Sequence, residues 1–335
     1  MSRAAVFGAG SWGTAFGLVL CDAGTDTTLY ARRPELASAI ATRHENSDYL
    51  PGVTLPGQLR ATSDPEEALA GADIVVFALP SQALRQRLVE LAPLIPRDAL
   101  LVSLIKGIEL RTARRMTEVI QEVLDTPEER VALVTGPNFA TEVAERLPAA
   151  SVVACADEGA AARLQKVCHT PRFRPYTNTD VVGCELGGAV KNVIALAVGM
   201  AEGLGLGDNA KASLITRGLA ETARLGAALG ADQHTLSGLA GLGDLVATCA
   251  SPLSRNRTFG ENLGKGMTLS EVKSATRQTA EGVKSCEAIA ELARRHDVDM
   301  PIVDHVVAVV HDGMSPRETV HSLMSRTAKP ERHGH

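Results

Sequence analysis

Two lysines and one aspartate are the residues best suited to chemistry in this chain. Lys106 stands between an apolar run and a glycine, Lys191 lies among small apolar residues, and Asp244 directly follows a glycine. Burial lowers the pKa of a lysine, so that its amine can donate or accept a proton near neutral pH. The plainer interpretations are a solvated loop lysine at 106 and, at 191, a lysine whose amine reaches solvent along its apolar stem. The pattern favours acid–base chemistry at Lys191.

Two further clusters could bind the anionic part of a substrate. Ser254, Arg255 and Asn256 are consecutive, and the last two offer up to about seven N–H donors, which suits a phosphate. Gly136 and Asn138 follow an expected strand, where ligands of open α/β sheets bind. A solvated surface arginine and an ordinary Gly-Pro turn are the alternatives.

The N-terminus predicts a dinucleotide site. The apolar run Arg3–Phe7 leads straight into the sequence GAGSWG, whose glycines are Gly8, Gly10 and Gly13. Gly8 allows the tight turn, Gly10 lets the backbone approach a pyrophosphate, and Gly13 lets the next helix pack on the sheet. The pyrophosphate then lies at a helix N-terminus, where N–H groups and the helix dipole favour negative charge. A glycine-rich turn without a ligand is the alternative.

Arg32 and Arg33, after the next apolar run, indicate which dinucleotide is bound. A free ribose 2′-OH is usually held by an acidic residue about 20 residues on from the turn. This chain has two arginines there instead, and a guanidinium binds phosphate oxygens in pairs. We therefore expect NADPH to be preferred and NADH to be accepted, unless the two arginines are only a solvated surface pair.

The elements that must position these residues are short strands and helices in alternation, which predict a Rossmann-like, doubly wound α/β sheet. Near-continuous apolar runs favour parallel strands buried on both faces. The expected strands are Arg3–Phe7, Thr27–Ala31, Asp73–Leu79, Ala99–Ile105, Val131–Thr135, Ala150–Ala154 and Phe173–Thr177. The expected helices between them are Gly13–Ala23, Pro34–Arg43, Pro65–Ala70, Gln82–Leu91, Ala113–Leu124, Thr141–Glu145 and Gly159–Cys168.

Beyond about residue 180 the strand signals stop, and helical patterns rich in alanine and leucine predict an all-α C-terminal domain. The expected helices are Glu185–Gly203, Asn209–Leu229, Leu239–Thr248, Glu281–His296 and Ile302–Val310. We expect an NAD(P)-binding Rossmann domain at 1–180, a helical substrate-binding domain at 181–325 and a flexible tail at 326–335.

The composition argues against several classes of protein. The net charge of −5 argues against nucleic-acid binding, which requires a basic surface. No stretch approaches about 18 uninterrupted apolar residues, so no membrane span is expected. The six cysteines are scattered without a CxxC pair, which predicts reduced thiols in a cytoplasmic protein and no metal site.

Together the clusters predict the reduction of a carbonyl group in a small phosphorylated substrate. The dinucleotide supplies a hydride, a lysine supplies a proton, and the Ser254–Asn256 cluster holds the phosphate.

The chain resembles the bacterial type of NAD(P)-dependent glycerol-3-phosphate dehydrogenase. Its motifs occur in the family's order and extend to about Met324. They are GAGSWGTA at Gly8–Ala15, SLIKGIE at Ser103–Glu109, GPNFATEVA at Gly136–Ala144, ELGGAVKNVIAL at Glu185–Leu196, GLGDLVATC at Gly241–Cys249, SRNRTFG at Ser254–Gly260 and AEGVKS at Ala280–Ser285.

The resemblance implies the reversible reduction of dihydroxyacetone phosphate to sn-glycerol 3-phosphate, which supplies glycerophospholipid synthesis. It makes Lys191 the general acid–base, with Lys106 and Asp244 in the same catalytic set, and by analogy it implies a homodimer. The implied substrate contacts are Lys106, Gly136, Asn138, Lys191, Asp244, Ser254, Arg255 and Asn256. The implied cofactor contacts are Gly8, Gly10, Ser11, Trp12, Gly13, Arg32, Arg33, Lys106, Ala140, Arg255 and Glu281.

Two positions depart from the family's pattern. Asn138 stands where other members often have Ser or Thr, so an amide replaces a hydroxyl. The residues Gly282–Lys284, after Glu281, stand where other members often carry an aromatic side chain.

Two other functions stay open at this point. A ketopantoate-type reductase also combines a Rossmann domain, a helical domain and a Lys-Asn pair, but it does not call for the phosphate clamp at Ser254–Asn256. A redox sensor would bind NADPH without turnover, and the presence of Lys106, Lys191 and Asp244 together argues against it.

Overall fold

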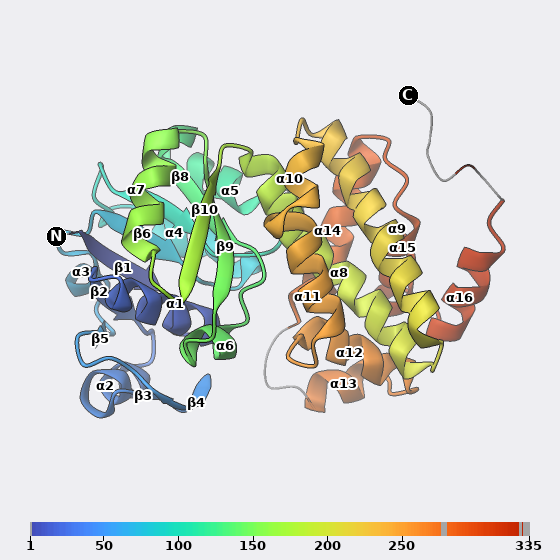
Figure 1. Ribbon diagram of the computed structural model, residues 1–335, viewed down its shortest axis with the longest axis horizontal. Helices are drawn as coiled ribbons and strands as arrows, with labels where there is room; N and C mark the ends of the chain where they lie inside the picture. The colour runs from blue at the N-terminus through green and yellow to red at the C-terminus, as the bar shows by residue number, and fades with distance from the viewer. Residues whose placement is uncertain (1, 276–279, 328–329, 331–335) are drawn as a thin grey trace.

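The computed structural model has a part built on a sheet and a part built of helices (Figure 1). It describes residues 2–275, 280–327 and 330. The last strand ends at Asn178 and the first long helix begins at Val181. This architecture confirms the predicted fold class, whereas most of the tail at 326–335 lies outside the described residues.

Within the described residues, eight strands form one sheet, in the order β10-β9-β8-β7-β6-β1-β2-β5. The chain runs outward from β1 through β2 to β5, and then returns to β6 on the other side of β1. Such a reversal opens a crevice at the carboxyl ends of the strands, where ligands bind. The strands are β1 (Arg3–Phe7), β2 (Asp26–Tyr30), β5 (Arg60–Thr62), β6 (Ile74–Phe77), β7 (Leu100–Ser103), β8 (Val131–Thr135), β9 (Ala149–Cys155) and β10 (Phe173–Asn178).

One strand pairing differs from the expected parallel sheet: β9 runs antiparallel to β8. The connection at 136–148 holds only the five-residue helix α6 (Ala140–Ala144). That helix rises about 7.5 Å, whereas a strand of five residues spans about 17 Å. The connection is therefore too short to return to the start of β8, and the chain re-enters the sheet in the opposite direction.

Helices cover both faces of the sheet. Ala4 and Val6 of β1 face the core under α1, whereas Ala5 and Phe7 face the core under α4 and α5. The helices of this part are α1 (Ser11–Asp22), α2 (Pro34–Arg43), α3 (Pro65–Leu69), α4 (Leu84–Leu91), α5 (Met116–Leu124) and α7 (Glu158–Cys168), besides α6 and the 3₁₀ turns η1 (Ser81–Ala83) and η2 (Glu128–Arg130).

In the second part, the other helices pack around α8 (Val181–Gly203). Within the described residues, α8 is the one helix whose length and mean hydropathy of 1.6 would suffice to cross a membrane. Because 83% of that apolar window is buried in the fold, α8 is the core helix of this part. The remaining elements are α9 (Gly207–Ala228), α10 (Gln233–Ser237), the π-helical η3 (Leu239–Gly243), α11 (Asp244–Ala250), α12 (Arg255–Gly264), α13 (Leu269–Ala275), α14 (Glu281–Arg295), α15 (Pro301–His311) and α16 (Pro316–Met324).

Helix α12, which the sequence did not predict, packs against α8 backbone to backbone. Cβ atoms on Gly199 and Gly203 of α8 would stand 2.0 and 2.2 Å from carbonyl oxygens of α12. Cβ atoms on Gly260 and Gly264 of α12 would likewise stand 2.1 and 2.3 Å from carbonyl oxygens of α8. Four glycines therefore set how closely α12 approaches the core helix.

The other elements that were not predicted are short. They are β5, the hairpin of β3 (Glu45–Asn46) and β4 (Leu50–Thr54), and the helices α10, α13 and α16. By contrast, β1, β8 and α2 have the predicted bounds. The six cysteines are free and buried, as expected.

Glu221 of α9 is a buried carboxylate that holds the start of α15. It is 2% exposed, and it accepts hydrogen bonds from the backbone N–H groups of Ile302 at 2.9 Å and Val303 at 3.4 Å. Burial raises the pKa of Glu221 to about 7, although the two N–H donors act in the opposite direction.

We expect the stability of the protein to fall as the pH rises from 4.5 to about 7, and Glu221→Gln to remove this part of the slope. In that window the folded protein holds a proton that the unfolded chain has lost, so ionisation of Glu221 costs stability. The full effect is about 3 kcal/mol. Urea unfolding of both proteins at several pH values measures it, and parallel curves would contradict the assignment.

Candidate active site

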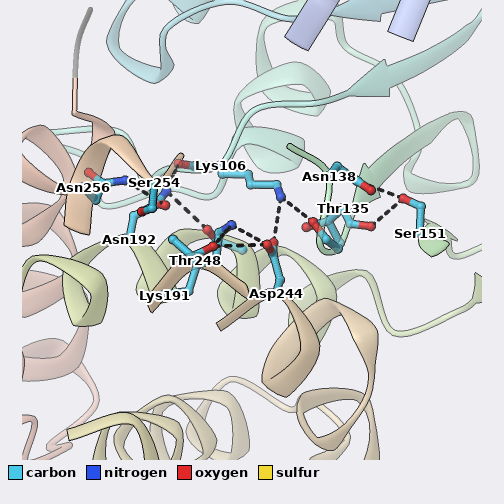
Figure 2. Close-up of polar contacts among 12 residues, drawn as sticks. Lys106, Thr135, Asn138, Ser151, Lys191, Asn192, Asp244, Thr248, Ser254 and Asn256 are labelled. Carbon is cyan, nitrogen blue, oxygen red and sulfur yellow. Dashed lines mark hydrogen bonds and ion pairs between the residues drawn. The ribbon is translucent and has the colours of Figure 1, made fainter. Parts of the chain in front are cut away.

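Asp244 lies between the amines of two lysines (Figure 2). Its Oδ2 accepts a hydrogen bond from Lys106 Nζ at 2.7 Å, and its Oδ1 accepts one from Lys191 Nζ. Lys106 Nζ also donates to the carbonyl oxygen of Gly136 at 2.8 Å. Asp244 is 1% exposed and Lys191 is 7% exposed. The structure thus brings together four of the predicted site residues, which come from the ends of β7 and β8, from α8 and from α11.

Two glycines of α8 allow this cluster to form. A Cβ on Gly187 would stand 2.4 Å from the carbonyl oxygen of Ala240, in the π-helical η3 that leads into Asp244. A Cβ on Gly188 would stand 3.5 Å from Cγ of Lys106. Gly187 therefore admits the backbone of η3 one turn before Lys191, and Gly188 leaves room for the stem of the other lysine.

The surroundings of Lys191 prepare it for proton transfer. Burial lowers the pKa of Lys191 to about 7; the carboxylate of Asp244 acts in the opposite direction, and the charge of Lys106 lowers the pKa further. An amine with this pKa is present in both protonation states at neutral pH. Two lysines that share one carboxylate also leave the cleft positively charged when both are protonated, which favours an anionic substrate.

Thr248 is part of this cluster, although the sequence analysis did not single it out. Its Oγ1 lies 2.7 Å from Lys191 Nζ, and the residue is 4% exposed. Thr248 follows Asp244 by one helical turn on α11. The spacing of four residues was the signal that could have identified it.

Asn192 and Asn256 connect α8 to α12 and α14. Asn256 donates to Oδ1 of Asn192 at 3.0 Å and accepts from the backbone N–H of Gly282 at 3.0 Å. Asn192 in turn donates to the carbonyl oxygen of Lys106 at 3.3 Å. Asn256 keeps one amide hydrogen for a ligand, so most of its hydrogen-bonding capacity positions the helices.

The predicted phosphate clamp is the N-terminus of α12. Ser254 caps this helix, since its Oγ accepts a hydrogen bond from the backbone N–H of Arg257 at 3.2 Å. Arg255 is the first helical residue, and it is exposed. The surrounding protein lowers the pKa of Arg255, an effect that the carboxylate of Glu281 partly offsets. Glu281 begins α14 and accepts a hydrogen bond from Ser81 Oγ at 2.8 Å. A helix N-terminus with an arginine favours a bound anion.

The dinucleotide turn has the predicted geometry. Gly8 has φ +124°, and a Cβ there would stand 2.2 Å from the carbonyl oxygen of Ala78. A Cβ on Gly13 would stand 1.9 Å from the carbonyl oxygen of Gly8. Among the described residues no atom lies within 4 Å of the Cβ position of Gly10, and α1 begins there without a side-chain cap. The open space over Gly10 and the uncapped amides fit a pyrophosphate.

The remaining predicted cofactor residues lie around this turn. Ser11 and Trp12 begin α1, and Ala140 begins α6, which packs beside α1. Arg32 and Arg33 follow β2 and are exposed. Because Phe7 pairs with Tyr30, the end of β2 adjoins the glycine turn.

Asn138 turns toward β9, where Ser151 fixes its orientation (Figure 2). Ser151 Oγ donates to the carbonyl oxygen of Thr135 at 2.8 Å and accepts from Asn138 Nδ2 at 2.9 Å. Oδ1 of Asn138 is buried and has no hydrogen-bond partner among the described residues. The sequence analysis missed Ser151 because the residue lies within an expected apolar strand.

Comparison with known proteins gives a single family over most of the chain. Residues 3–161 match the N-terminal model of NAD-dependent glycerol-3-phosphate dehydrogenase, and residues 180–321 match the C-terminal model. A relative from Streptomyces avermitilis, named as a glycerol-3-phosphate dehydrogenase of NAD(P)+, is 66% identical over 98% of both chains. A relative of the same name from Thermobifida fusca is 62% identical over all of both chains.

Solved structures agree with this comparison. The crystal structure of glycerol-3-phosphate dehydrogenase from Coxiella burnetii has a TM-score of 0.92 and 38% identity, covering 97% of this chain and 99% of that one. A ketopantoate reductase from Ralstonia eutropha has a TM-score of 0.60 and 18% identity, covering 96% of this chain and all of that one. The second likeness concerns the fold alone.

We expect Gly187→Ala to destabilise the protein by about 1–3 kcal/mol, because its Cβ forces the backbone of η3 away from α8. The matched control is Gly17→Ala, also within a helix. Its Cβ meets no atom closer than 3.4 Å, so this substitution should be neutral or stabilising. Urea unfolding of the three proteins decides, and equal losses in both variants would refute the close approach at Gly187.

Proposed function

Since this chain belongs to the family of NAD-dependent glycerol-3-phosphate dehydrogenases, we propose that Lys106, Lys191 and Asp244 carry out its reaction. The protein reduces dihydroxyacetone phosphate to sn-glycerol 3-phosphate, reversibly, with a nicotinamide cofactor. The observation that carries the assignment of residues is the buried carboxylate shared by two lysines, next to the cleft that opens at the ends of the strands.

The lysines and the carboxylate have distinct roles. When bound, the cofactor supplies the hydride that reduces the ketone carbon. The ammonium of Lys191 protonates the oxygen that becomes the C2 hydroxyl, and in the oxidation direction its neutral amine accepts that proton. Asp244 and Thr248 orient the amine, and the charge of Lys106 stabilises the negative charge that develops on the oxygen.

The substrate phosphate binds where α12 begins. Arg255 supplies a charged N–H fork, and Asn256 supplies the one amide hydrogen that its contacts leave over. Gly136 and Asn138 complete the proposed substrate contacts, with Ser254 as the cap of the helix. The proposed cofactor contacts are Gly8, Gly10, Ser11, Trp12, Gly13, Arg32, Arg33, Lys106, Ala140, Arg255 and Glu281.

The cofactor of the family is NAD or NADP. We propose a preference for NADPH on the strength of Arg32 and Arg33. The product is a precursor of glycerophospholipids, so we place the activity in lipid synthesis and in the cytoplasm. A homodimer is supported by three exposed apolar side chains of the helical part, Leu242, Val246 and Leu253.

A ketopantoate-type reductase is the alternative that shares the fold. The exposed arginine at a capped helix N-terminus favours a phosphorylated substrate over ketopantoate. The test is the oxidation of NADPH and NADH with dihydroxyacetone phosphate, with dihydroxyacetone and with ketopantoate. Rapid turnover of the phosphorylated ketone alone is expected. Preference for ketopantoate would support the alternative, and binding of NADPH without turnover of any ketose phosphate would indicate a sensor.

We expect Lys191→Ala to lower kcat by ~10²–10⁴-fold, the usual contribution of a general acid. The dissociation constant of NADPH should not change. Lys265→Ala is the control, because that lysine is exposed and pairs with Glu261. Turnover close to that of the unaltered enzyme would contradict the role of Lys191.

We expect opposite pH profiles for the two directions, because Lys191 has a pKa of about 7 in the folded protein. Reduction requires the ammonium, so kcat/KM for dihydroxyacetone phosphate should fall as the pH rises through about 7. Oxidation requires the neutral amine, so kcat/KM for glycerol 3-phosphate should rise over the same range. Profiles that change in the same direction would exclude Lys191 as the shared proton carrier.

A further inference from the structure

A short hairpin lies against the dinucleotide turn, and it is held there by three hydrogen bonds. Asn46 of β3 is 0% exposed, and its Nδ2 donates to the carbonyl oxygen of Ala9 at 3.0 Å and to Thr14 Oγ1 at 2.8 Å. Ser11 Oγ donates to the carbonyl oxygen of Tyr49 at 2.9 Å. The turn of the hairpin therefore has a fixed place relative to the glycine turn.

This hairpin turn carries a carboxylate to the end of β2. Asp48 lies between the two anchors, and its Oδ2 pairs with a terminal nitrogen of Arg33. The two side chains are 56% and 50% exposed, so the pair stands open to solvent. The end of β2 is where folds of this class hold the adenosine ribose, with an acidic residue for a 2′-OH or an arginine for a 2′-phosphate. Here both groups are present and are bonded to each other.

We propose that Asp48 sets the balance between NADPH and NADH, an inference that rests on the proposed function. To bind a 2′-phosphate, Arg33 must release Asp48, whose like charge then faces the phosphate. To bind a 2′-OH, Asp48 accepts the hydroxyl hydrogen with one carboxylate oxygen while Arg33 stays paired with the other. Asp48 thus disfavours NADPH and favours NADH, whereas Arg33 does the reverse.

The spacing explains why the sequence gave no sign of this residue. The acidic residue of such folds usually follows the turn by about 20 residues in sequence. Asp48 instead reaches the site from a separate hairpin, and the β3–β4 pairing and Asn46 bring it there.

The experiment measures dissociation constants by the fluorescence of NADPH and of NADH, without turnover. In Asp48→Asn we expect roughly two- to fivefold tighter binding of NADPH and roughly two- to fivefold weaker binding of NADH, the range typical of an exposed ion pair. Asp22→Asn is the matched control, because Asp22 forms a surface pair with Arg146, and it should change neither constant.

A second variant tests whether Asp48 acts through Arg33. In an Arg33→Gln background, Asp48→Asn should no longer tighten NADPH by the full factor. Unchanged constants in Asp48→Asn, or a shift of both in the same direction, would overturn the proposal. Failure to reduce dihydroxyacetone phosphate would instead refute the proposed function, which the two dissociation constants do not measure.

Discussion

The active site depends on one buried carboxylate that is shared by two ammonium groups. Moving a charge out of water costs several kcal/mol unless it is paired and hydrogen-bonded, and Asp244 is almost fully buried. The pairing in turn requires that three separate elements meet: the loop after β7, helix α8 and the start of α11. Side chains on their facing surfaces would keep them apart, so glycine occupies the contact positions of α8.

The same principle organises the second half of the molecule. Helix α8 presents Gly187 to η3 and its C-terminal glycines to α12, so both neighbours approach its backbone. The close approach of α12 brings Asn256 to Asn192, and this contact links the phosphate end of the cleft to the backbone of Lys106. Packing and chemistry therefore share one helix: one set of its residues fixes distances, and another set uses them.

Much of the fold and the reacting residues could be predicted from the sequence, because those signals are local. The strand and glycine turn at Arg3–Gly13 are contiguous, and Lys106, Lys191 and Asp244 each stand out against apolar neighbours. Helix α12 was missed because its buried stripe consists of Asn256, Phe259, Gly260 and Leu263, of which only two are apolar side chains. The reversal of β9 and the positions of Ser151 and Asp48 depend on contacts between distant segments, which no local pattern records.

Helix α8 also has a consequence for the synthesis of the protein. Its apolar surface is covered in part by α14 and α15, which begin at Glu281 and Pro301, well after its own end at Gly203. At roughly 5–20 residues per second, the nascent chain carries an uncovered helix, hydrophobic enough for a membrane, for several seconds. During that interval the core of the finished enzyme is an exposed hydrophobic segment. The order of the elements along the chain thus makes this protein a natural client of the chaperones that shield emerging chains.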